Sequence, residues 1–282
     1  MTSADLDDCP ERILLDQLEW YYDAVPRHGA RAEDFGPLTL FVREGQGWPF
    51  YARPALGWSG AVSAAAVDRV RARQRELGVP EGFEWIAETT PLLRVAIEDS
   101  GLVVHEHPLM VLDPGAPVPT ADELPVGSSV RIIGPDDPAL ASALAVPHLA
   151  FAEPGTGVGS AGVDELAEAV RIRAEDGSVD RAVARIEAGL TAVAAAVESG
   201  TVLCAGRHQP VGAVSEIVGV GTLPTARRRG LGLAVTAALV ADARSRGVET
   251  VFLSAGDDDV ARIYARLGFR RIATALIAEP AE

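Results

Sequence analysis

The stretch Ser215–Gly232, which reads SEIVGVGTLPTARRRGLG, decides the fold of this chain. Its first half alternates as a β-strand does, with one residue facing each side in turn. This alternation predicts a shared strand face for Glu216, Val218, Val220 and Thr222. Two glycines leave the strand backbone open to close approach, and Pro224 ends the strand. The residues from Gly230 onward then begin a helix, so the segment predicts a strand, a turn and a helix in immediate succession.

The turn contains three consecutive arginines and two glycines, Arg227-Arg228-Arg229-Gly230-Leu231-Gly232. The first amides of a helix have no partner within it, and the macrodipole adds about half a positive charge, so an anion is favoured there. The pattern therefore predicts a pyrophosphate site; the alternative is an ordinary helix start with a solvated basic turn. Two common nucleotide motifs do not fit this strand, turn and helix, because GxxxxGK[ST] needs a lysine and the segment has no GxGxxG with an acidic residue about 20 positions on.

The chain as a whole is strongly acidic. Its 25 basic residues stand against 40 acidic residues, for a formal net charge of −15. This balance excludes a generally basic nucleic-acid-binding protein, since affinity for DNA depends on neutralising phosphates with cations. The sequence contains no lysine and no asparagine, a bias typical of GC-rich bacterial genomes, so every basic residue is an arginine. Lysine is therefore excluded as a catalytic base, and an anionic ligand requires a local basic site.

Composition also bears on the compartment. No run approaches the roughly 18 apolar residues that a membrane span needs, and the first ten residues lack an export signal. Cys9 and Cys204 lie far apart and form no CxxC or Cys/His cluster, which argues against a disulfide framework or a zinc site. We therefore expect a cytoplasmic bacterial protein, a monomer or homodimer, with no metal and with neither membrane nor nucleic acid as a partner.

A linker divides the chain. Four prolines and two glycines mark residues 113–127, between a first domain at residues 1–112 and a second at residues 128–282. Strands and helices alternate on both sides, which predicts an α/β (α+β) fold with a central sheet. In the second domain we expect a glycine-rich loop at residues 153–162, either near the substrate or as a plain connector, and helical structure over residues 163–199.

The two halves end in the same order of elements: a helix, a Gly-Val pair, a strand, a short helix, a glycine followed by a hydrophobic residue, and a strand. Gly78-Val79 corresponds to Gly247-Val248, and Gly101-Leu102 corresponds to Gly268-Phe269. This correspondence suggests an internal duplication, with coincidence among generic βαβ units as the alternative.

Two motifs resemble those of the GNAT-type N-acetyltransferase superfamily. The first is V-x-x-x-P followed by [RQ]-x-x-G-x-[GA] and a long helix, here Val220–Pro224 and Arg227–Gly232. The second is N-x-x-A-x-x-x-Y-x-x-x-G-F, here DDDVARIYARLGF at residues 257–269. Asp257 replaces the usual asparagine, and Val260 replaces a small residue. The resemblance covers residues 128–282 and, with the duplication, implies two GNAT-like domains, each a mixed central β-sheet flanked by helices.

The resemblance implies acetyl-CoA, or another acyl-CoA, as the donor. Backbone amides of Arg228 to Leu233 would hold the pyrophosphate, and backbone groups of Val220 to Thr222 would pair with pantetheine. Separation of this strand from the strand at Thr250–Ser254 would admit the thioester. The implied donor-binding residues are Val218, Val220, Gly221, Thr222, Arg227, Arg228, Arg229, Gly230, Leu231, Gly232, Leu233 and Asp257.

The chemistry of amine acylation indicates further residues. The acceptor amine must lose a proton, so Glu216 is the candidate base, although an edge or ion-paired glutamate fits equally well. His148 or a water molecule is the second candidate for the base. A strand amide near Val218 would stabilise the oxyanion. By resemblance, Tyr264 would protonate the leaving thiolate, whereas its helical periodicity alone would suit a core tyrosine.

These features predict an acyltransferase that moves an acetyl group from acetyl-CoA to a primary amine of a small molecule, by direct attack in a ternary complex. The negative charge favours a cationic acceptor. In the aligned halves Ile97 lies opposite Tyr264, and no R-x-x-G-x-G precedes the helix at Val62–Leu77, so we interpret the first domain as a degenerate GNAT-like domain. The alternatives are a non-catalytic acyl-CoA sensor or assembly module, and a protein that binds another phosphorylated ligand.

Overall fold

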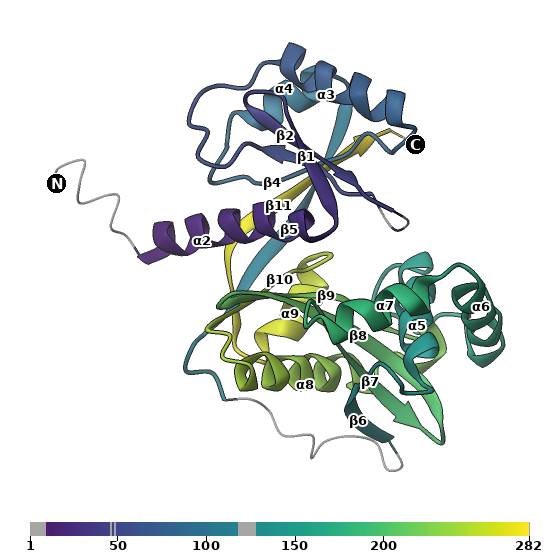
Figure 1. The fold of residues 1–282 in the computed structure, drawn as a ribbon. Coiled ribbons are helices and arrows are strands. Elements are labelled where there is room, and N and C mark those ends of the chain that lie inside the picture. The colour runs from purple at the N-terminus through teal and green to yellow at the C-terminus, as the bar shows by residue number, and fades with distance from the viewer. Residues whose placement is uncertain (1–9, 46, 48, 118–127, 282) are drawn as a thin grey trace. The chain divides into compact units, whose positions relative to one another are not determined.

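The computed structural model describes residues 10–45, 47, 49–117 and 128–281, which form two compact units (Figure 1). Unit 1 contains the described residues up to Leu109, together with Ala255–Asp257 and those from Arg271 onward. Unit 2 contains the described part of Met110–Ser254 and Asp258–Arg270. Each unit has a mixed β-sheet with flanking helices, which confirms the predicted fold class. Among the described residues, no helix combines the length and the apolar character that crossing a membrane requires.

Unit 1 begins with a helix that leads into a sheet. Its elements are α2 (Pro10–Ala24), the short 3₁₀ helix η1 (Pro26–His28), β1 (Ala30–Asp34), β2 (Leu38–Arg43), β3 (Ala52–Pro54), α3 (Ala64–Leu77), β4 (Phe83–Ile86), α4 (Leu93–Asp99) and most of β5 (Leu102–Leu112). The strand order is β1-β2-β3-β4-β11-β5. Strands β3 and β4 are parallel, whereas β1–β2, β2–β3 and β4–β11 are antiparallel.

The core of unit 1 lies between this sheet and α3 and α4. Helix α3 buries Ala66, Val67 and Val70, which lie on one face by helical spacing. They pack in one cluster with β4, where Phe83 and Trp85 are fully buried. Each large apolar side chain buried in this way contributes about 1.5–3 kcal/mol relative to exposure. The hydrophobic alternation of the strands and the helical stripe therefore position the unit 1 sheet.

Unit 2 has the longer strands and helices. Its elements are β6 (Ser128–Ile133), α5 (Leu140–Ala152), α6 (Val163–Glu175), α7 (Ser178–Glu187), β7 (Ala192–Glu198), β8 (Thr201–Val211), β9 (Val214–Thr222), the short 3₁₀ helix η3 (Pro224–Ala226), α8 (Leu231–Ser245), β10 (Thr250–Ser254), α9 (Asp258–Ala265) and the start of β11 (Phe269–Pro280). The strand order is β10-β9-β8-β7-β6. Neighbours in this order are antiparallel except for β9 and β10, which are parallel.

Helices α5 and α8 cover opposite faces of the unit 2 sheet. Both contact β8 and β9. A Cβ atom built on Gly221 of β9 would lie 2.7 Å from the Cα atom of Pro147 in α5. A Cβ atom built on Gly232 of α8 would lie 3.6 Å from the Oγ1 atom of Thr222. Because consecutive strand residues point to opposite faces, Gly221 faces α5 and Thr222 faces α8.

The same hydrogen bonds recur at the corresponding positions of the two halves, which supports the predicted duplication. After α3, Gly78 N–H bonds Arg75 O and Val79 N–H bonds Gln74 O; after α8, Gly247 and Val248 bond Arg244 O and Ala243 O at the same offsets. All four matched glycines, Gly78, Gly101, Gly247 and Gly268, have positive φ between 67° and 91°. A left-handed residue that ends a helix is the conformation that glycine adopts most readily.

The contacts divide the chain differently from the sequence-based boundaries of 1–112 and 128–282. Strand β11 from Arg271 onward belongs to unit 1, where Ala275–Ala278 pair with β4. Conversely, the end of β5 from Met110 belongs to unit 2. The last residues of β5 are therefore grouped with unit 2, and the residues of β11 from Arg271 onward are grouped with unit 1. Of the predicted linker, residues 118–127 lie outside the described residues.

The prediction of helical structure over residues 163–199 is confirmed for α6 and α7 and is wrong beyond Glu187. Helices α6 and α7 end at Glu187, and Ala192–Glu198 form strand β7. Five residues from Ala192 to Ala196 are buried, and β7 pairs with β6 on one side and with β8 on the other. Alanine favours helix in isolation, but small side chains also suit a central strand covered on both faces, and tertiary packing decided between the two.

Candidate active site

Strands β9 and β10 are parallel neighbours that separate part-way along their length. Their pairing runs from Val214 with Thr250 to Glu216 with Phe252 and stops there. Strand β9 nevertheless continues to Thr222. We call this separation the β9–β10 fork. Beyond it, the edge of β9 that faced β10 presents peptide groups that can pair with an extended ligand, as an added strand would.

A β-bulge lies in β9 just beyond the fork. Gly219 has a φ of 63°, a left-handed conformation that favours glycine. The register with β8 moves from Val218 opposite Arg207 to Gly221 opposite Ala205, so β9 contains one extra residue. A bulge interrupts the ladder, bends the strand and reverses the faces of the residues that follow.

The bulge contradicts the predicted shared strand face. Ser215 lies on the α8 face, because it bonds His208, which in turn bonds Asp242 of α8. Uninterrupted alternation would put Gly221 on that face too, yet Gly221 faces α5. Glu216 and Val218 therefore lie on the α5 face, whereas Val220 and Thr222 lie on the α8 face. Simple alternation failed because it assumes a strand without an inserted residue.

Helix α8 begins immediately after this strand without a side-chain cap. Its N-cap is Gly230, with a φ of 78°, and the first intrahelical bond runs from Ala234 N–H to Gly230 O. The amides of Leu231, Gly232 and Leu233 therefore have no intrahelical acceptor. Arg228 also has a positive φ of 67°, so the turn before the helix departs from regular structure at two residues. Such an open helix start, with its dipole, suits a phosphate group.

The three arginines of the turn have different partners. Arg227 donates through its guanidinium to the backbone carbonyls of Ala150, Glu153 and Gly157, so it binds the end of α5. Arg229 forms an ion pair with Glu198 of β7, with N–O distances of 2.7 and 3.1 Å. This bond lowers the pKa of the Glu198 carboxyl group. Arg228 is exposed, and the structure records no ion pair for it with any residue in the described ranges. Sequence alone treated the three as equivalent.

The glycine-rich loop is bound to the turn before α8. The Glu153 carboxylate accepts hydrogen bonds from Ser160 and from the Ala161 amide, and Gly159 N–H bonds Pro224 O at 3.1 Å. A Cβ atom on Gly159 would lie 2.3 Å from Glu153 Oε2 and 2.9 Å from Pro224 Cβ. Close packing therefore explains this glycine, and the loop is part of the support for the α8 turn.

Tyr264 lies in α9, half-buried, with its ring edge-on to Phe269 at 6.1 Å between centroids. Burial raises the pKa of the Tyr264 phenol, which lies close enough to Cys204 for the two groups to interact. Cys204 of β8 is fully buried, which raises the pKa of its thiol to about 12, and Thr222 donates a hydrogen bond to its Sγ atom at 3.3 Å. Tyr264 is therefore a protonated phenol beside β8 and the end of β9.

The remaining candidates lie in different settings. Glu216 is half-buried, and it is the last residue of β9 that pairs with β10. Its side chain lies on the α5 face of the sheet. His148 is exposed on α5, next to the Pro147 that contacts β9. Asp257 is exposed in the turn before α9 and clusters with unit 1. Within unit 2, the structure thus brings the fork, the bulge, the open start of α8 and Tyr264 to one region of the sheet.

Comparison with known proteins agrees with this architecture. Residues 197–277 match the family model described as FR47-like protein. A solved structure of a GCN5-related N-acetyltransferase (GNAT) from Kribbella flavida is 22% identical, covers 95% of this chain and 96% of its own, and has a TM-score of 0.69. The chain therefore has the fold of GNAT proteins. No curated protein matches it.

Two further structures share the GNAT fold over most of the chain. A putative acetyltransferase from Novosphingobium aromaticivorans is 18% identical, with 93% of this chain and 96% of that chain covered and a TM-score of 0.52. A tandem GNAT protein from the clavulanic acid biosynthesis pathway is 16% identical, with 87% and 80% covered and a TM-score of 0.55. The likeness of fold therefore extends over residues of both units.

Unit 1 also has a parallel strand pair, and an ion pair connects its two strands. Strands β3 and β4 pair at Ala52 and Phe83. The next residue, Arg53, is 4% exposed and donates across to Glu84 at 2.9 Å, with its guanidinium 4.2 Å from the ring of Tyr22. A side-chain ion pair therefore links β3 to β4, whereas β9 and β10 separate beyond Glu216.

The helix start and the short helix of unit 1 also differ from those of unit 2. Ser63 caps α3 by accepting the Ala66 amide, whereas Gly230 of α8 has no side chain to do so. Ile97 is fully buried in the core of unit 1. The Ile97 carbonyl accepts a hydrogen bond from Ser100 N–H, and the Tyr264 carbonyl accepts one from Leu267 N–H. The matching bonds place Ile97 and Tyr264 at corresponding positions. These features agree with the interpretation of the first domain as a degenerate GNAT-like copy.

A Ser-His-Asp chain in unit 2 was missed by sequence analysis. Ser215 Oγ lies 2.8 Å from His208 Nδ1, and His208 Nε2 lies 2.8 Å from Asp242 Oδ2. His208 and Ser215 are both 0% exposed, so no substrate reaches the serine, and the chain connects β8, β9 and α8. Burial lowers the pKa of His208 despite the hydrogen bond to Asp242. No spacing rule in the sequence links these residues, because a hairpin and a helix bring them together.

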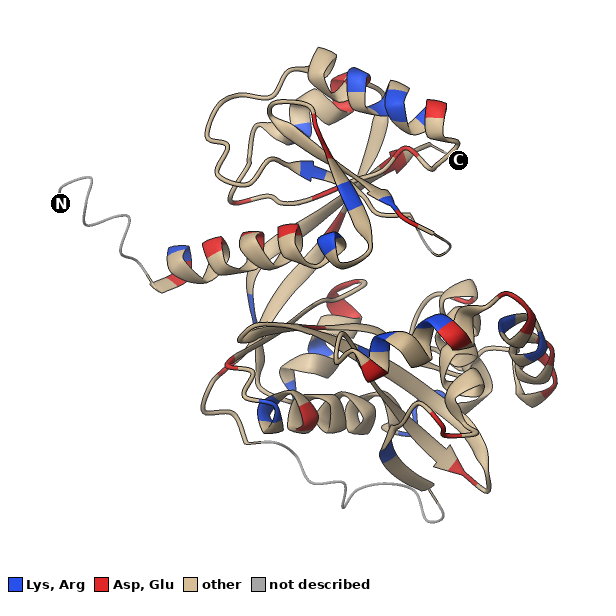
Figure 2. Ribbon diagram, viewed as in Figure 1, with Lys and Arg blue, Asp and Glu red and all other residues tan. Residues whose placement is uncertain are grey.

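Charged groups are distributed widely over both units. Figure 2 shows basic and acidic residues interspersed along the elements of each unit, with no single basic surface in this view. Across the described residues 10–45, 47, 49–117 and 128–281, no group of three or more His, Cys, Asp or Glu side chains has the arrangement of a metal site.

Proposed function

We propose that this GNAT protein transfers an acetyl group from acetyl-CoA to a primary amine of a small molecule, by direct attack in a ternary complex. The observation that carries the proposal is the uncapped, glycine-initiated α8 helix directly after the β9–β10 fork. The helix start suits a pyrophosphate, and the open strand edge suits an extended amide-containing arm. Coenzyme A carries both groups on one molecule.

Donor binding would use mainly backbone groups. The amides of Arg228 to Leu233 would hold the pyrophosphate, and the peptide groups of Val220 to Thr222 would pair with pantetheine. Arg228 would supply the mobile guanidinium, since Arg227 and Arg229 are already engaged with α5 carbonyls and with Glu198. Those two arginines would hold the turn in place, and Asp257 would approach the pantetheine arm from the turn before α9.

The proposed chemistry uses two residues for proton transfer: one accepts a proton from the amine, and the other donates a proton to the leaving thiolate. Glu216, on the α5 face, would accept the proton of the acceptor ammonium, with His148 or water as the alternative base. The neutral nitrogen then attacks the thioester carbon; a C–N bond forms, and the carbonyl electrons move to an oxyanion that the Val218 amide would stabilise. Collapse re-forms the carbonyl and breaks the C–S bond, and Tyr264 would donate its phenolic proton to the thiolate. A raised phenol pKa keeps that proton available at neutral pH. The amide nitrogen would then lose its second proton to the Tyr264 phenolate, directly or through water, and Glu216 would release the first proton to solvent.

The acceptor is proposed to be a cationic small molecule because the net charge of −15 raises its local concentration. A cytoplasmic location and a bacterial source complete the proposal, with no metal in the reaction and a monomer or homodimer as the working form.

The experiment that tests the proposal measures thiol release from acetyl-CoA with a panel of amines, together with the melting temperature in the presence of coenzyme A. We expect coenzyme A to raise the melting temperature, since ligand binding to the native state stabilises it. Tyr264→Phe should lower the rate of thiol release without loss of coenzyme A binding. Tyr51→Phe is the matched control, because that hydroxyl bonds Glu279 in unit 1.

The outcomes separate the alternatives. Binding of coenzyme A without turnover by any amine, unaffected by Tyr264→Phe, would establish the sensor or assembly module instead. If coenzyme A gives no thermal protection and another nucleotide does, the donor assignment is wrong.

A further inference from the structure

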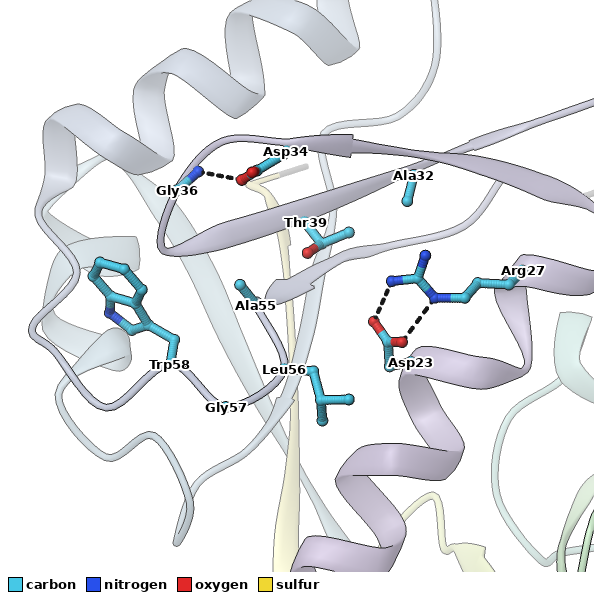
Figure 3. Close-up of a pocket in the computed structure, with 10 residues that line it drawn as sticks. All are labelled: Asp23, Arg27, Ala32, Asp34, Gly36, Thr39, Ala55, Leu56, Gly57 and Trp58. Carbon is cyan, nitrogen blue, oxygen red and sulfur yellow. Dashed lines mark hydrogen bonds and ion pairs between the residues drawn. The ribbon is translucent and has the colours of Figure 1, made fainter.

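Unit 1 contains a cavity to which no role has been given so far. It lies between the end of α2, the β1–β2 hairpin and the segment that follows β3, and its volume is about 500 Å³ (Figure 3). Small-molecule sites occupy roughly 300–1,000 Å³. Asp34, Thr39, Ala55 and Trp58 surround one side of it, and Asp23 and Arg27 lie at the other. We call it the unit 1 cavity.

The cavity is lined by two carboxylates and one guanidinium, those of Asp23, Asp34 and Arg27, so its formal net charge is −1. Arg27 forms a two-bond ion pair with Asp23, at 2.7 and 2.9 Å, and this bond raises the pKa of the Arg27 guanidinium. The same guanidinium lies 5.4 Å from the centroid of the Phe41 ring. Asp34 accepts only the Gly36 amide, at 2.7 Å, and no cation among the described residues pairs with it. A cation entering the cavity therefore meets an available carboxylate.

Apolar side chains lie beside this carboxylate. Trp58 is 43% exposed and Leu56 is 50% exposed. The indole is held in position, because Nε1 donates to Gly60 O at 2.8 Å and a Cβ atom on Gly60 would lie 3.1 Å from the ring. An indole face attracts cations and apolar groups alike, and holding it in advance lowers the entropy cost of binding.

A threonine hydroxyl points into the same space. Thr39 is only 9% exposed, and its hydroxyl is directed toward Ala55 and Leu56 (Figure 3). The structure records no hydrogen bond for this hydroxyl with any residue of the described ranges. Its oxygen is not one of the fully buried polar atoms that lack a partner, so it keeps some exposure to the cavity. The Thr39 oxygen can accept a hydrogen bond from a ligand that also reaches Asp34.

From these groups we infer that the unit 1 cavity binds a protonated primary amine that carries an apolar group. The ammonium would donate to Asp34 and Thr39, and the apolar part would lie against Leu56 and Trp58. A carboxylate alone would accept any cation, but the Thr39 hydroxyl and the fixed indole select one with N–H donors and hydrocarbon. This inference does not rest on the proposed acyl transfer, because the residues that line the cavity belong to unit 1, whereas the start of α8 belongs to unit 2.

The test measures binding of 2-phenylethylammonium to the full chain by isothermal titration calorimetry, without acetyl-CoA. Two probes of the same skeleton are compared with it: the neutral 2-phenylethanol and the anionic phenylacetate. Asp34→Asn removes the charge and keeps an oxygen to accept the Gly36 amide, so the turn is retained. Asp99→Asn, at an exposed site of α4 in the same unit, is the control. Trp58→Leu tests the aromatic contact separately.

We expect the ammonium probe to bind more tightly than both other probes, and Asp34→Asn to weaken its binding by about twofold to fivefold, as for an exposed ion pair. Trp58→Leu should weaken it by about threefold, the lower range for a cation near an indole. Asp99→Asn should leave it unchanged. Equal binding of 2-phenylethanol, binding that Asp34→Asn does not alter, or no saturation up to the solubility limit would each overturn the inference. Binding insensitive to Asp34→Asn would place the amine elsewhere, as at the acceptor site of unit 2.

Discussion

Replacing Gly221 by alanine tests how closely α5 approaches β9. The added Cβ atom would lie 2.7 Å from Pro147 Cα and 2.8 Å from Ala150 Cβ. Neither neighbour is the end of a flexible side chain, since one is backbone and the other is fixed to it. The sequence suggested that this glycine makes room for a ligand; the structure indicates that it makes room for a helix.

The expected cost follows from these distances. Carbon atoms in van der Waals contact lie about 3.5–4.0 Å apart, so α5 must retreat from β9 by about 1 Å. Overpacking of this kind costs about 1–3 kcal/mol. For domains of roughly 150–250 residues, each 1 kcal/mol lowers the melting temperature by about 2–4 °C. We therefore expect Gly221→Ala to lower the unfolding temperature of unit 2 by about 2–12 °C.

The distribution of tryptophans allows the two units to be followed separately. All four tryptophans lie in the first 85 residues, so tryptophan fluorescence reports unit 1, whereas far-ultraviolet circular dichroism reports both units. Gly221→Ala should shift the circular dichroism transition and leave the fluorescence transition less affected. The control is Gly134→Ala, because a Cβ atom there meets nothing within 4 Å. That variant should stay within about 0.5 kcal/mol of the parent protein.

One result would refute the reasoning. If Gly221→Ala is no less stable than Gly134→Ala in urea unfolding at equal m-values, then α5 does not lie against β9 at this distance. A binding measurement with coenzyme A adds a functional readout, since a displaced α5 would pull on Arg227 through its bonds to Ala150 and Glu153.

Three further predictions follow from single contacts. Arg228→Ala should weaken coenzyme A binding about fivefold, the effect of losing one exposed charge contact of about 1 kcal/mol, while Arg69→Ala on α3 should have no effect in the same titration. The free energy of unfolding should fall as the pH drops below 6.5, the ordinary pKa of histidine, because burial lowers the pKa of His208 and the unfolded chain takes up the proton more readily. In His208→Gln the free energy of unfolding should depend less on pH over this range. Ser63→Ala should destabilise unit 1 by about 1 kcal/mol in a fluorescence-detected urea titration, through loss of the α3 cap, and a flat result would contradict the cap.

Part of the candidate site could be predicted because it depends on neighbours in sequence. The open start of α8 requires only a strand, a glycine with positive φ and a helix in succession, and Gly230 and the residues around it specify all three. The position of Tyr264 on its helix is likewise local. The partners of Arg227 and Arg229 were not predictable, since the Ala150 carbonyl and the Glu198 carboxylate are distant in sequence and come into reach only when α5 and β7 pack.

The sequence by itself determined where α3 and α8 end, because left-handed glycines act within one turn of chain: Gly78 and Gly247 end these helices with the same hydrogen bonds. Only the tertiary structure decided which unit receives a strand. Strand β11 follows α9 in sequence yet pairs with β4, and the alanine-rich segment Ala192–Glu198 became a strand because β6 and β8 offered hydrogen bonds on both sides. Pairing and burial are interactions between distant segments, and their free energy exceeds the small local preferences that a sequence pattern reports.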